Sequence, residues 1–178
     1  MNNFKKVTLA ALTAITTIVP TAVEAKNVDR GHMDLVRAIA STGVELKINP
    51  EACYENPDKT LYGWYWAAKN EMVICQENAT HYNTETYWTA EDFDTLRHEA
   101  QHLIQDCRDG SLNGSLDSVY KEPIKLALDV LGESKSKSII RTYSDSSEHI
   151  QVMELEAFAV AAMNDPADQS NDIKTYCF

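Results

Sequence analysis

The sequence predicts an α+β domain, with a small sheet in its N-terminal half and helices in its C-terminal half. Residues 44–48 alternate apolar and polar side chains as a strand does, and residues 61–67 and 71–76 are rich in aromatic and β-branched residues. Beyond residue 88, apolar side chains recur at helical spacing behind capping residues. The 178 residues suit one domain of ordinary size.

The first 25 residues have the pattern of a signal peptide. Two lysines precede an apolar run over residues 7–19, and a V-x-A cleavage site ends at Ala25. The run is shorter than the about 20 apolar residues that span a bilayer, although an uncleaved N-terminal anchor is the alternative. We therefore expect residues 1–25 to be a signal peptide and residues 26–178 to be a single domain, secreted or periplasmic, without membrane contact after cleavage.

The expected mature chain begins with elements of a small sheet. A helix is predicted over residues 29–40, where apolar side chains recur three and four residues apart, and it ends before Gly43. The strand at 44–48 follows. The runs at 61–67 and 71–76 are separated by a short polar turn, which predicts a β-hairpin.

The second half is expected to be helical. Thr89 and Asp92 form a T-x-x-D capping signal for a helix that runs to about residue 106. Its apolar side chains form one stripe: Phe93, Leu96, Ala100, Leu103 and Cys107. Two further helical stretches cover about 117–131 and 135–142, and Asp145 with Glu148 caps a last helix over about 146–163.

The chain is strongly acidic, since 27 Asp and Glu residues against 16 Lys and Arg give a net charge of −11. A nucleic-acid-binding protein needs basic side chains to neutralise phosphates, and an anionic membrane surface attracts basic segments. The composition therefore disfavours both kinds of partner. We expect the domain to act as a monomer.

All four cysteines lie in the expected mature chain: Cys53, Cys75, Cys107 and Cys177. An even number of cysteines in an exported protein predicts two disulfides, for which three pairings exist. We favour Cys53–Cys75 and Cys107–Cys177, because the first two flank one segment and Cys177 can hold the C-terminus.

One segment, residues 98–102, has the HExxH pattern of a catalytic metal site. His98 and His102 are four residues apart, so on a helix they lie on one face, where both can bind one Zn²⁺ ion. Glu99 lies beside them, where its carboxylate can act as the general base of a metallopeptidase. The pattern arises by chance in about one chain in a hundred of this composition, and the alternative is a histidine pair without a metal.

The candidates for a third zinc ligand lie in residues 148–159, which end in the stretch E-L-E-A-F-A over residues 154–159. Together with the HExxH motif, this stretch resembles the gluzincin branch of zinc metallopeptidases, in which a Glu often followed by Ala completes the site. The resemblance implies a small zincin-like domain with Glu156 as the third ligand and Glu154 as the alternative. Gluzincins often carry an Asp four residues after this Glu, whereas Val160 stands here.

Other residues are candidates for the surroundings of the metal. His149 lies two helical turns before Glu156 on nearly the same face, so it is a candidate donor to the oxyanion. Tyr143 and Tyr120 are weaker candidates of the same kind. Zincins of this layout place an edge strand beside the metal, to which an extended peptide adds, and Met72–Gln76 is the candidate segment.

These observations predict an exported zinc metallopeptidase. Zinc is expected on His98, His102 and Glu156, with Glu99 as general base and His149 at the oxyanion. The expected substrate is a peptide or protein, a peptidoglycan peptide included. Two other classes stay open: a secreted module that binds zinc without catalysis, and a disulfide-stapled interaction protein in which the motif is accidental.

Overall fold

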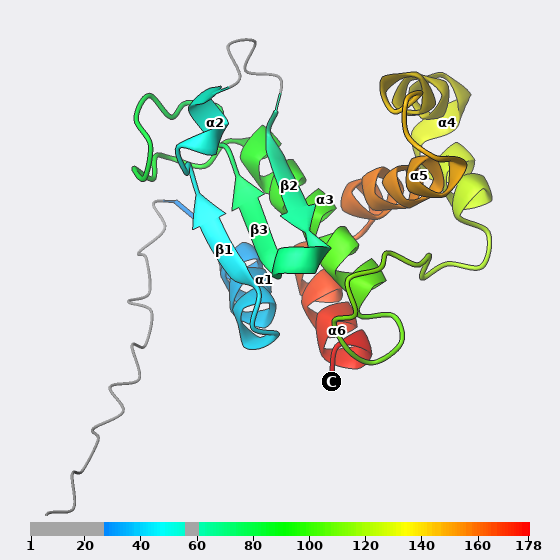
Figure 1. The fold of residues 1–178 in the computed structure, drawn as a ribbon, viewed down its shortest axis with the longest axis horizontal. Helices are drawn as coiled ribbons and strands as arrows, with labels where there is room; N and C mark the ends of the chain where they lie inside the picture. Colours follow the sequence, from blue (N-terminus) through cyan, green and yellow to red (C-terminus); the bar gives the residue numbers. More distant parts are fainter. Residues whose placement is uncertain (1–26, 56–60) are drawn as a thin grey trace, which may run out of the picture.

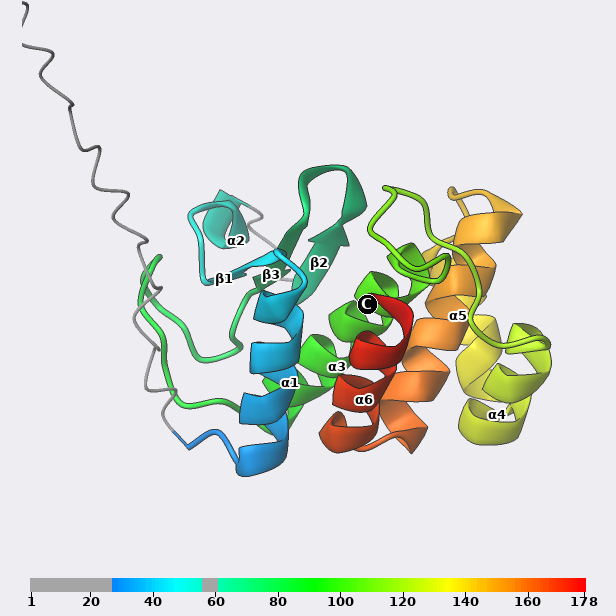
Figure 2. The same ribbon diagram turned by 90° about the horizontal axis from the view of Figure 1, so that it is seen from below.

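The computed structural model describes residues 27–55 and 61–178, so the expected signal peptide lies outside the described residues. As predicted, the structure is α+β, with a three-stranded sheet in the N-terminal half and helices mostly in the C-terminal half. In chain order the elements are α1 (Arg30–Ser41), β1 (Glu45–Ile48), α2 (Ala52–Glu55), β2 (Gly63–Trp66), a 3-10 turn (Ala67–Lys69), β3 (Glu71–Ile74), α3 (Ala90–Asp106), α4 (Pro123–Thr142), α5 (Glu148–Met163) and α6 (Pro166–Tyr176). The sheet forms one layer and the helices a second, with α5 and α4 beyond its edge (Figures 1 and 2).

Strand β3 lies at the centre of the sheet, in the order β1-β3-β2. It pairs in parallel with β1 and antiparallel with β2, so the predicted hairpin is confirmed. The hairpin turns at Asn70, whose left-handed backbone conformation Asn tolerates better than most residues. The prediction that Met72–Gln76 forms the sheet edge is wrong, because β1 covers the other side of β3. Strand β2 is the edge strand that packs against α3.

The main core lies between the sheet and helices α1, α3 and α6. The predicted apolar stripe of α3 points into it and meets Met72 and Ile74 of β3, which are fully buried. A smaller core holds α4 against α5 and consists of Ala127, Ile139, Leu155 and Ala159. Helix α5 therefore packs between α3 on one side and α4 on the other.

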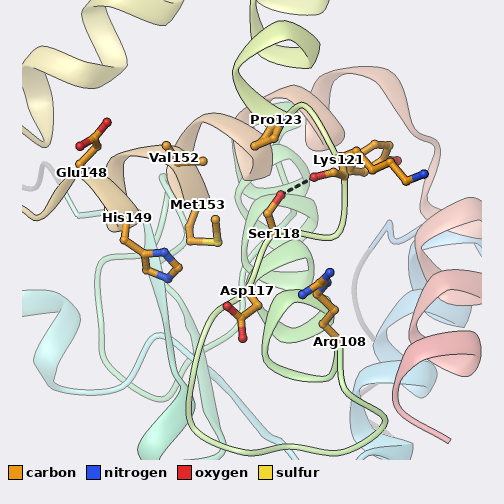
Figure 3. Close-up of a pocket in the computed structure, with 10 residues that line it drawn as sticks. Arg108, Asp117, Ser118, Lys121, Pro123, Glu148, His149, Val152 and Met153 are labelled. Carbon is orange, nitrogen blue, oxygen red and sulfur yellow. Dashed lines mark hydrogen bonds between the residues drawn. The ribbon is translucent and has the colours of Figure 1, made fainter.

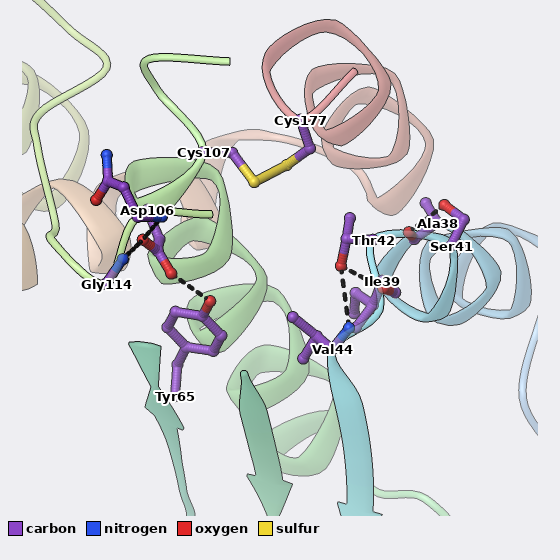
Figure 4. The surroundings of a disulfide bond; sticks show 11 residues. Ala38, Ile39, Ser41, Thr42, Val44, Tyr65, Asp106, Cys107, Gly114 and Cys177 are labelled. Carbon is purple, nitrogen blue, oxygen red and sulfur yellow. Dashed lines mark hydrogen bonds between the residues drawn. A yellow bond between two sulfur atoms is a disulfide. The ribbon is translucent and has the colours of Figure 1, made fainter. Parts of the chain in front are cut away.

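Helix α3, which carries the HExxH motif, is anchored at both ends. At its start Thr89 and Asp92 form the predicted capping box, in which each backbone N–H donates to the other side chain. At its end Asp106 accepts a hydrogen bond from the hydroxyl of Tyr65 on β2, at 2.7 Å (Figure 4). The second contact fixes the end of the helix relative to the edge strand.

Both favoured disulfides are formed. Cys53 is bonded to Cys75, and Cys107 at the end of α3 is bonded to Cys177 at the end of α6 (Figure 4). The second bridge holds the C-terminus against the helix that carries the motif. Within residues 27–55 and 61–178, the helices lack the length and apolar character that crossing a membrane requires.

The helical half differs from expectation at several boundaries. Helix α4 begins at Pro123 and not at about residue 117, because proline suits the first turn of a helix. Gly132, with a φ of 78°, divides it into two helical parts. Helix α5 begins behind Ser147, whose side chain accepts from a backbone N–H of the first turn. Helix α6 was not expected, although Asp165 caps it and Pro166 occupies its first turn.

Candidate metal centre

Helices α3 and α5 bring three metal-binding side chains together. His98 and His102 lie one turn apart on α3, and their Nε2 atoms are 3.1 Å from each other. Glu154 on α5 faces both: its Oε2 lies 3.2 Å from Nε2 of His98, and its Oε1 lies 3.4 Å from Nε2 of His102. This group can hold a metal ion.

One donor atom from each of the three residues can be chosen so that all three lie within 4.8 Å of one another. Bonds of about 2.0–2.1 Å at the tetrahedral angle place two ligand atoms about 3.3–3.4 Å apart. The two Nε2 atoms are 3.1 Å apart, whereas the 3.2 and 3.4 Å separations from the imidazoles to Glu154 end on its two different oxygens. The spacing of the two histidine nitrogens therefore suits two ligands of one ion, with the Glu154 carboxylate beside both, and two imidazoles with one carboxylate form a ligand set known from catalytic zinc sites.

A polar atom of the group lacks a partner. Glu154 Oε2 is buried and accepts no hydrogen bond from residues 27–55 or 61–178, although it faces the ring of His98. An unsatisfied carboxylate oxygen in a protein interior is unfavourable. A cation bound between the three side chains would satisfy this atom.

The three side chains also influence one another through charge. Burial alone would raise the pKa of Glu154, but the imidazoles of His102 and His98 outweigh it and hold that pKa well below its ordinary value. Burial would lower the pKa of His102, but the carboxylates of Glu154 and Glu99 outweigh it and raise the pKa to about 9. Glu154 is therefore ionised throughout the neutral range, as a metal ligand must be.

Glu99 lies beside this group at a cleft. The cleft has a volume of about 440 Å³ and is lined by residues of β2, α3, α4 and α5, including Gly63, His98, Glu99 and Tyr143. Burial raises the pKa of Glu99, although the charges of His98 and His102 oppose the shift. A carboxyl group with a raised pKa at a cleft is suited to accept a proton and to give it back.

Glu156 does not reach the histidines, which corrects the prediction that it is the third ligand. It follows Glu154 by two residues, about 200° around the helix, so it points away from the group. It is fully buried there. Its carboxylate accepts hydrogen bonds from five donors: Gln101 Nε2, Gln105 Nε2, Ser118 Oγ, and the backbone N–H groups of Val119 and Tyr120. Glu156 thus joins α5 to α3 and to the segment 118–120.

His149 also lies away from the group, which corrects its expected place at the oxyanion. Its side chain is exposed, and its Nε2 lies 2.6 Å from the carbonyl oxygen of Leu116. It borders a different pocket, together with Asp117 and Met153 (Figure 3). The reason is the same as for Glu156, since both residues share the face of α5 that is turned from His98 and His102.

A family model described as a domain of unknown function, DUF8637, matches residues 24–178. The chain belongs to this family. Comparisons with curated proteins and with solved structures gave no match. The family description names no activity, so an inference about the function of the DUF8637 domain depends on its residues and their geometry.

Tyr143 is the tyrosine that the DUF8637 domain places beside the group. It lies at the C-terminal end of α4 and lines the same cleft as His98 and Glu99. Burial raises the pKa of its hydroxyl above the ordinary value, and the carboxylates of Glu154 and Glu99 raise it further. The hydroxyl therefore keeps its proton at neutral pH and can act as a hydrogen-bond donor.

Two further residues of the DUF8637 domain complete the surroundings. Tyr120, the other weaker candidate, lies on the side of Glu156 and donates its backbone N–H to that carboxylate. Sequence reasoning missed Gln105, whose Oε1 lies 2.8 Å from Nδ1 of His102. Its position three residues after His102 was the available signal, since side chains at that spacing meet on a helix.

Proposed function

We propose that this chain is an exported zinc-dependent peptidase, in which His98, His102 and Glu154 bind the metal and Glu99 is the general base. The observation that carries the proposal is the close approach of His98, His102 and Glu154, whose facing nitrogen and oxygen atoms lie 3.1–3.4 Å apart, beside a buried carboxyl group at a cleft. Among the described residues the group has three protein donors. Catalytic zinc sites keep one position open in this way, whereas structural sites are closed by four protein ligands.

The residues around the group of His98, His102 and Glu154 have the properties that peptide hydrolysis requires. Zinc, when bound, polarises a carbonyl group and makes water a strong nucleophile at neutral pH. Glu99 accepts a proton from the attacking water and then delivers it to the leaving nitrogen, a step that its raised pKa favours. Tyr143, which stays protonated, donates a hydrogen bond to the carbonyl oxygen as negative charge develops there.

Strand β2 supports an extended peptide as the substrate. In the register of the hairpin, residues 62 and 64 hydrogen-bond to β3, so the N–H and C=O groups of Gly63 and Tyr65 lie on the outer edge of the sheet. There the backbone N–H of Tyr65 donates to the Glu99 carboxylate, which leaves the groups of Gly63 for a peptide. Gly63 lines the cleft together with Glu99. A peptide that adds to this edge as a further strand runs beside the general base. The substrate class is therefore a peptide or protein, a peptidoglycan peptide included.

Export is supported by the two disulfides, which persist in oxidising compartments. The leader-like pattern of residues 1–25 supports the same conclusion. The proposed location is therefore outside the cytoplasm, in the secreted or periplasmic fraction.

Zinc content and cleavage of a peptide library test the proposal in three forms of the protein: wild type, Glu99→Gln and Glu148→Gln. Glu148 is an exposed carboxylate on α5, so Glu148→Gln removes the same charge as Glu99→Gln at a position outside the site and serves as the control. We expect about one zinc per chain in all three forms and cleavage by wild type and Glu148→Gln alone. Equal cleavage by Glu99→Gln would assign the activity to a contaminant. Zinc without cleavage in the wild type would make the chain a binding module, and absence of zinc would refute the site.

A further inference from the structure

We propose that Gln105 is a positioning residue, which holds the imidazole of His102 in the one tautomer that can bind zinc. The inference rests on the proposed metal site. Gln105 is fully buried on α3, one turn beyond His102, and does not itself face the metal position. Its side chain makes three hydrogen bonds, and together these determine which ring nitrogen of His102 carries the proton.

The orientation of the Gln105 amide is fixed by two acceptors. Its Nε2 lies 3.1 Å from the carbonyl oxygen of Met153 and 3.1 Å from Oε1 of Glu156. A carbonyl oxygen accepts and does not donate, so the NH₂ group must lie on this side. The amide oxygen of Gln105 therefore has to face His102, where it lies 2.8 Å from Nδ1.

This orientation selects the tautomer of His102. The amide oxygen can only accept, so Nδ1 of the ring must carry the hydrogen. In the neutral ring the lone pair then lies on Nε2, the atom that faces His98 and Glu154. Metal-ligating histidines commonly donate their second N–H in this manner, which orients the ring and raises its affinity.

Glu156 gives this arrangement its rigidity. It holds the Gln105 amide and is held in turn by Ser118 and by the backbone of the segment 118–120. The two glutamates of the E-x-E stretch thus have complementary positions: Glu154 faces the metal position directly, and Glu156 acts on the opposite side through Gln105. An amide thereby occupies the position beside the ligand histidine that a carboxylate takes in many zinc sites.

The neighbouring residue Gln101 provides a matched control. It is also buried on α3, one turn before Gln105, and its Nε2 donates to the same Oε1 of Glu156 at 3.1 Å. Gln101 has no hydrogen bond to either histidine ring among the contacts of the described residues. Gln101→Met and Gln105→Met therefore remove similar bonds to Glu156, and the second also removes the contacts with His102 and with the carbonyl oxygen of Met153.

The affinity for zinc, measured by chelator competition in folded protein, tests the positioning role. We expect Gln105→Met to weaken zinc binding by about 10–100-fold, the usual effect of losing such a partner, and Gln101→Met to leave it near the wild-type value. Equal affinities in Gln105→Met and Gln101→Met would overturn the inference.

Nitrogen-15 NMR of His102 in the metal-free protein tests the tautomer without zinc. In the neutral form of the ring, which a pH titration of the same signals identifies, we expect the hydrogen on Nδ1 in wild type and Gln101→Met. In Gln105→Met we expect a shift towards the Nε2–H form. The same tautomer in Gln105→Met as in wild type would overturn the inference even if zinc binds. If the wild type binds no zinc, the proposed function is refuted, and the tautomer measurement alone decides the role of Gln105.

Discussion

Substitution of the two α5 glutamates, one at a time, is expected to separate metal binding from folding. Glu154→Gln removes one of the three proposed zinc ligands. Loss of a residue that only hydrogen-bonds to a ligand weakens metal binding by up to about 100-fold, so we expect a larger loss of zinc affinity here. Glu156→Gln leaves all three ligands in place. Its Gln105 partner keeps the hydrogen bond to Met153, and we therefore expect zinc binding to persist in the folded fraction.

The effect of Glu156→Gln on stability follows from its hydrogen bonds. Every partner of this carboxylate is a donor, with three on Oε1 and two on Oε2. The hydroxyl of Ser118 can turn to the carbonyl of Tyr120, 2.7 Å away, but the N–H of Tyr120 cannot turn. In Glu156→Gln the NH₂ group of the new amide replaces one of the two oxygens, and in either position it leaves at least one buried donor without an acceptor. The remaining hydrogen bonds are then made to a neutral oxygen instead of a charged one. We expect the free energy of unfolding to fall by about 2–4 kcal/mol.

Urea unfolding of the metal-free proteins gives the stability, and metal analysis after dialysis against zinc gives the stoichiometry. The expected pattern is a folded Glu154→Gln that holds no zinc, and a Glu156→Gln that unfolds at lower urea but still holds about one zinc per chain. A folded Glu156→Gln without zinc, together with a Glu154→Gln that retains it, would refute the assignment of the third ligand.

Three more predictions follow from the structure. The pKa of His102 in the folded protein, about 9, exceeds its ordinary value of 6.5. Its imidazolium therefore stabilises the metal-free fold fully below pH 6.5, and this contribution of up to about 3 kcal/mol is lost as the pH rises through 9. A urea midpoint that does not change over this pH range, or the same decline in His102→Gln, would contradict this prediction. Opening the Cys107–Cys177 bridge, which spans 70 residues, by double substitution with Ser is expected to lower the unfolding free energy by about 4 kcal/mol in urea titrations, and an unchanged midpoint would argue against the bridge. In Gly63→Ala the new Cβ would lie 2.7 Å from Cγ2 of Thr95, so β2 must move away from α3, which costs about 1–3 kcal/mol of stability. We expect peptide cleavage to fall while zinc stays bound. Cleavage at the wild-type rate would show that the edge strand does not position the substrate.

The sequence alone predicted the helix of the candidate site but not the full set of ligands. The HExxH spacing and the Thr89–Asp92 capping box are local features, and the structure has both histidines on one buried face of α3. The choice between Glu154 and Glu156 depends on how α5 is rotated about its axis. That helix buries apolar side chains on several faces, because α3 and α4 pack on two sides of it, so no single stripe indicated the rotation.

The remaining differences also have physical causes. The central position of β3 results from parallel pairing with β1, a contact between distant segments that strand patterns do not encode. Helix α6 has the local signals of a helix start at Asp165 and Pro166, which also suit the end of the preceding helix. The disulfide pairing was accessible from the sequence because one bridge closes a single segment and the other fixes the chain end.

A crystal structure of the protein grown with zinc, with anomalous diffraction recorded at the zinc edge, would show directly whether His98, His102 and Glu154 bind the metal. We expect one strong peak between α3 and α5, about 2.0–2.2 Å from Nε2 of His98, Nε2 of His102 and an oxygen of Glu154. A peak coordinated by Glu156, or no peak beside the two histidines, would contradict it.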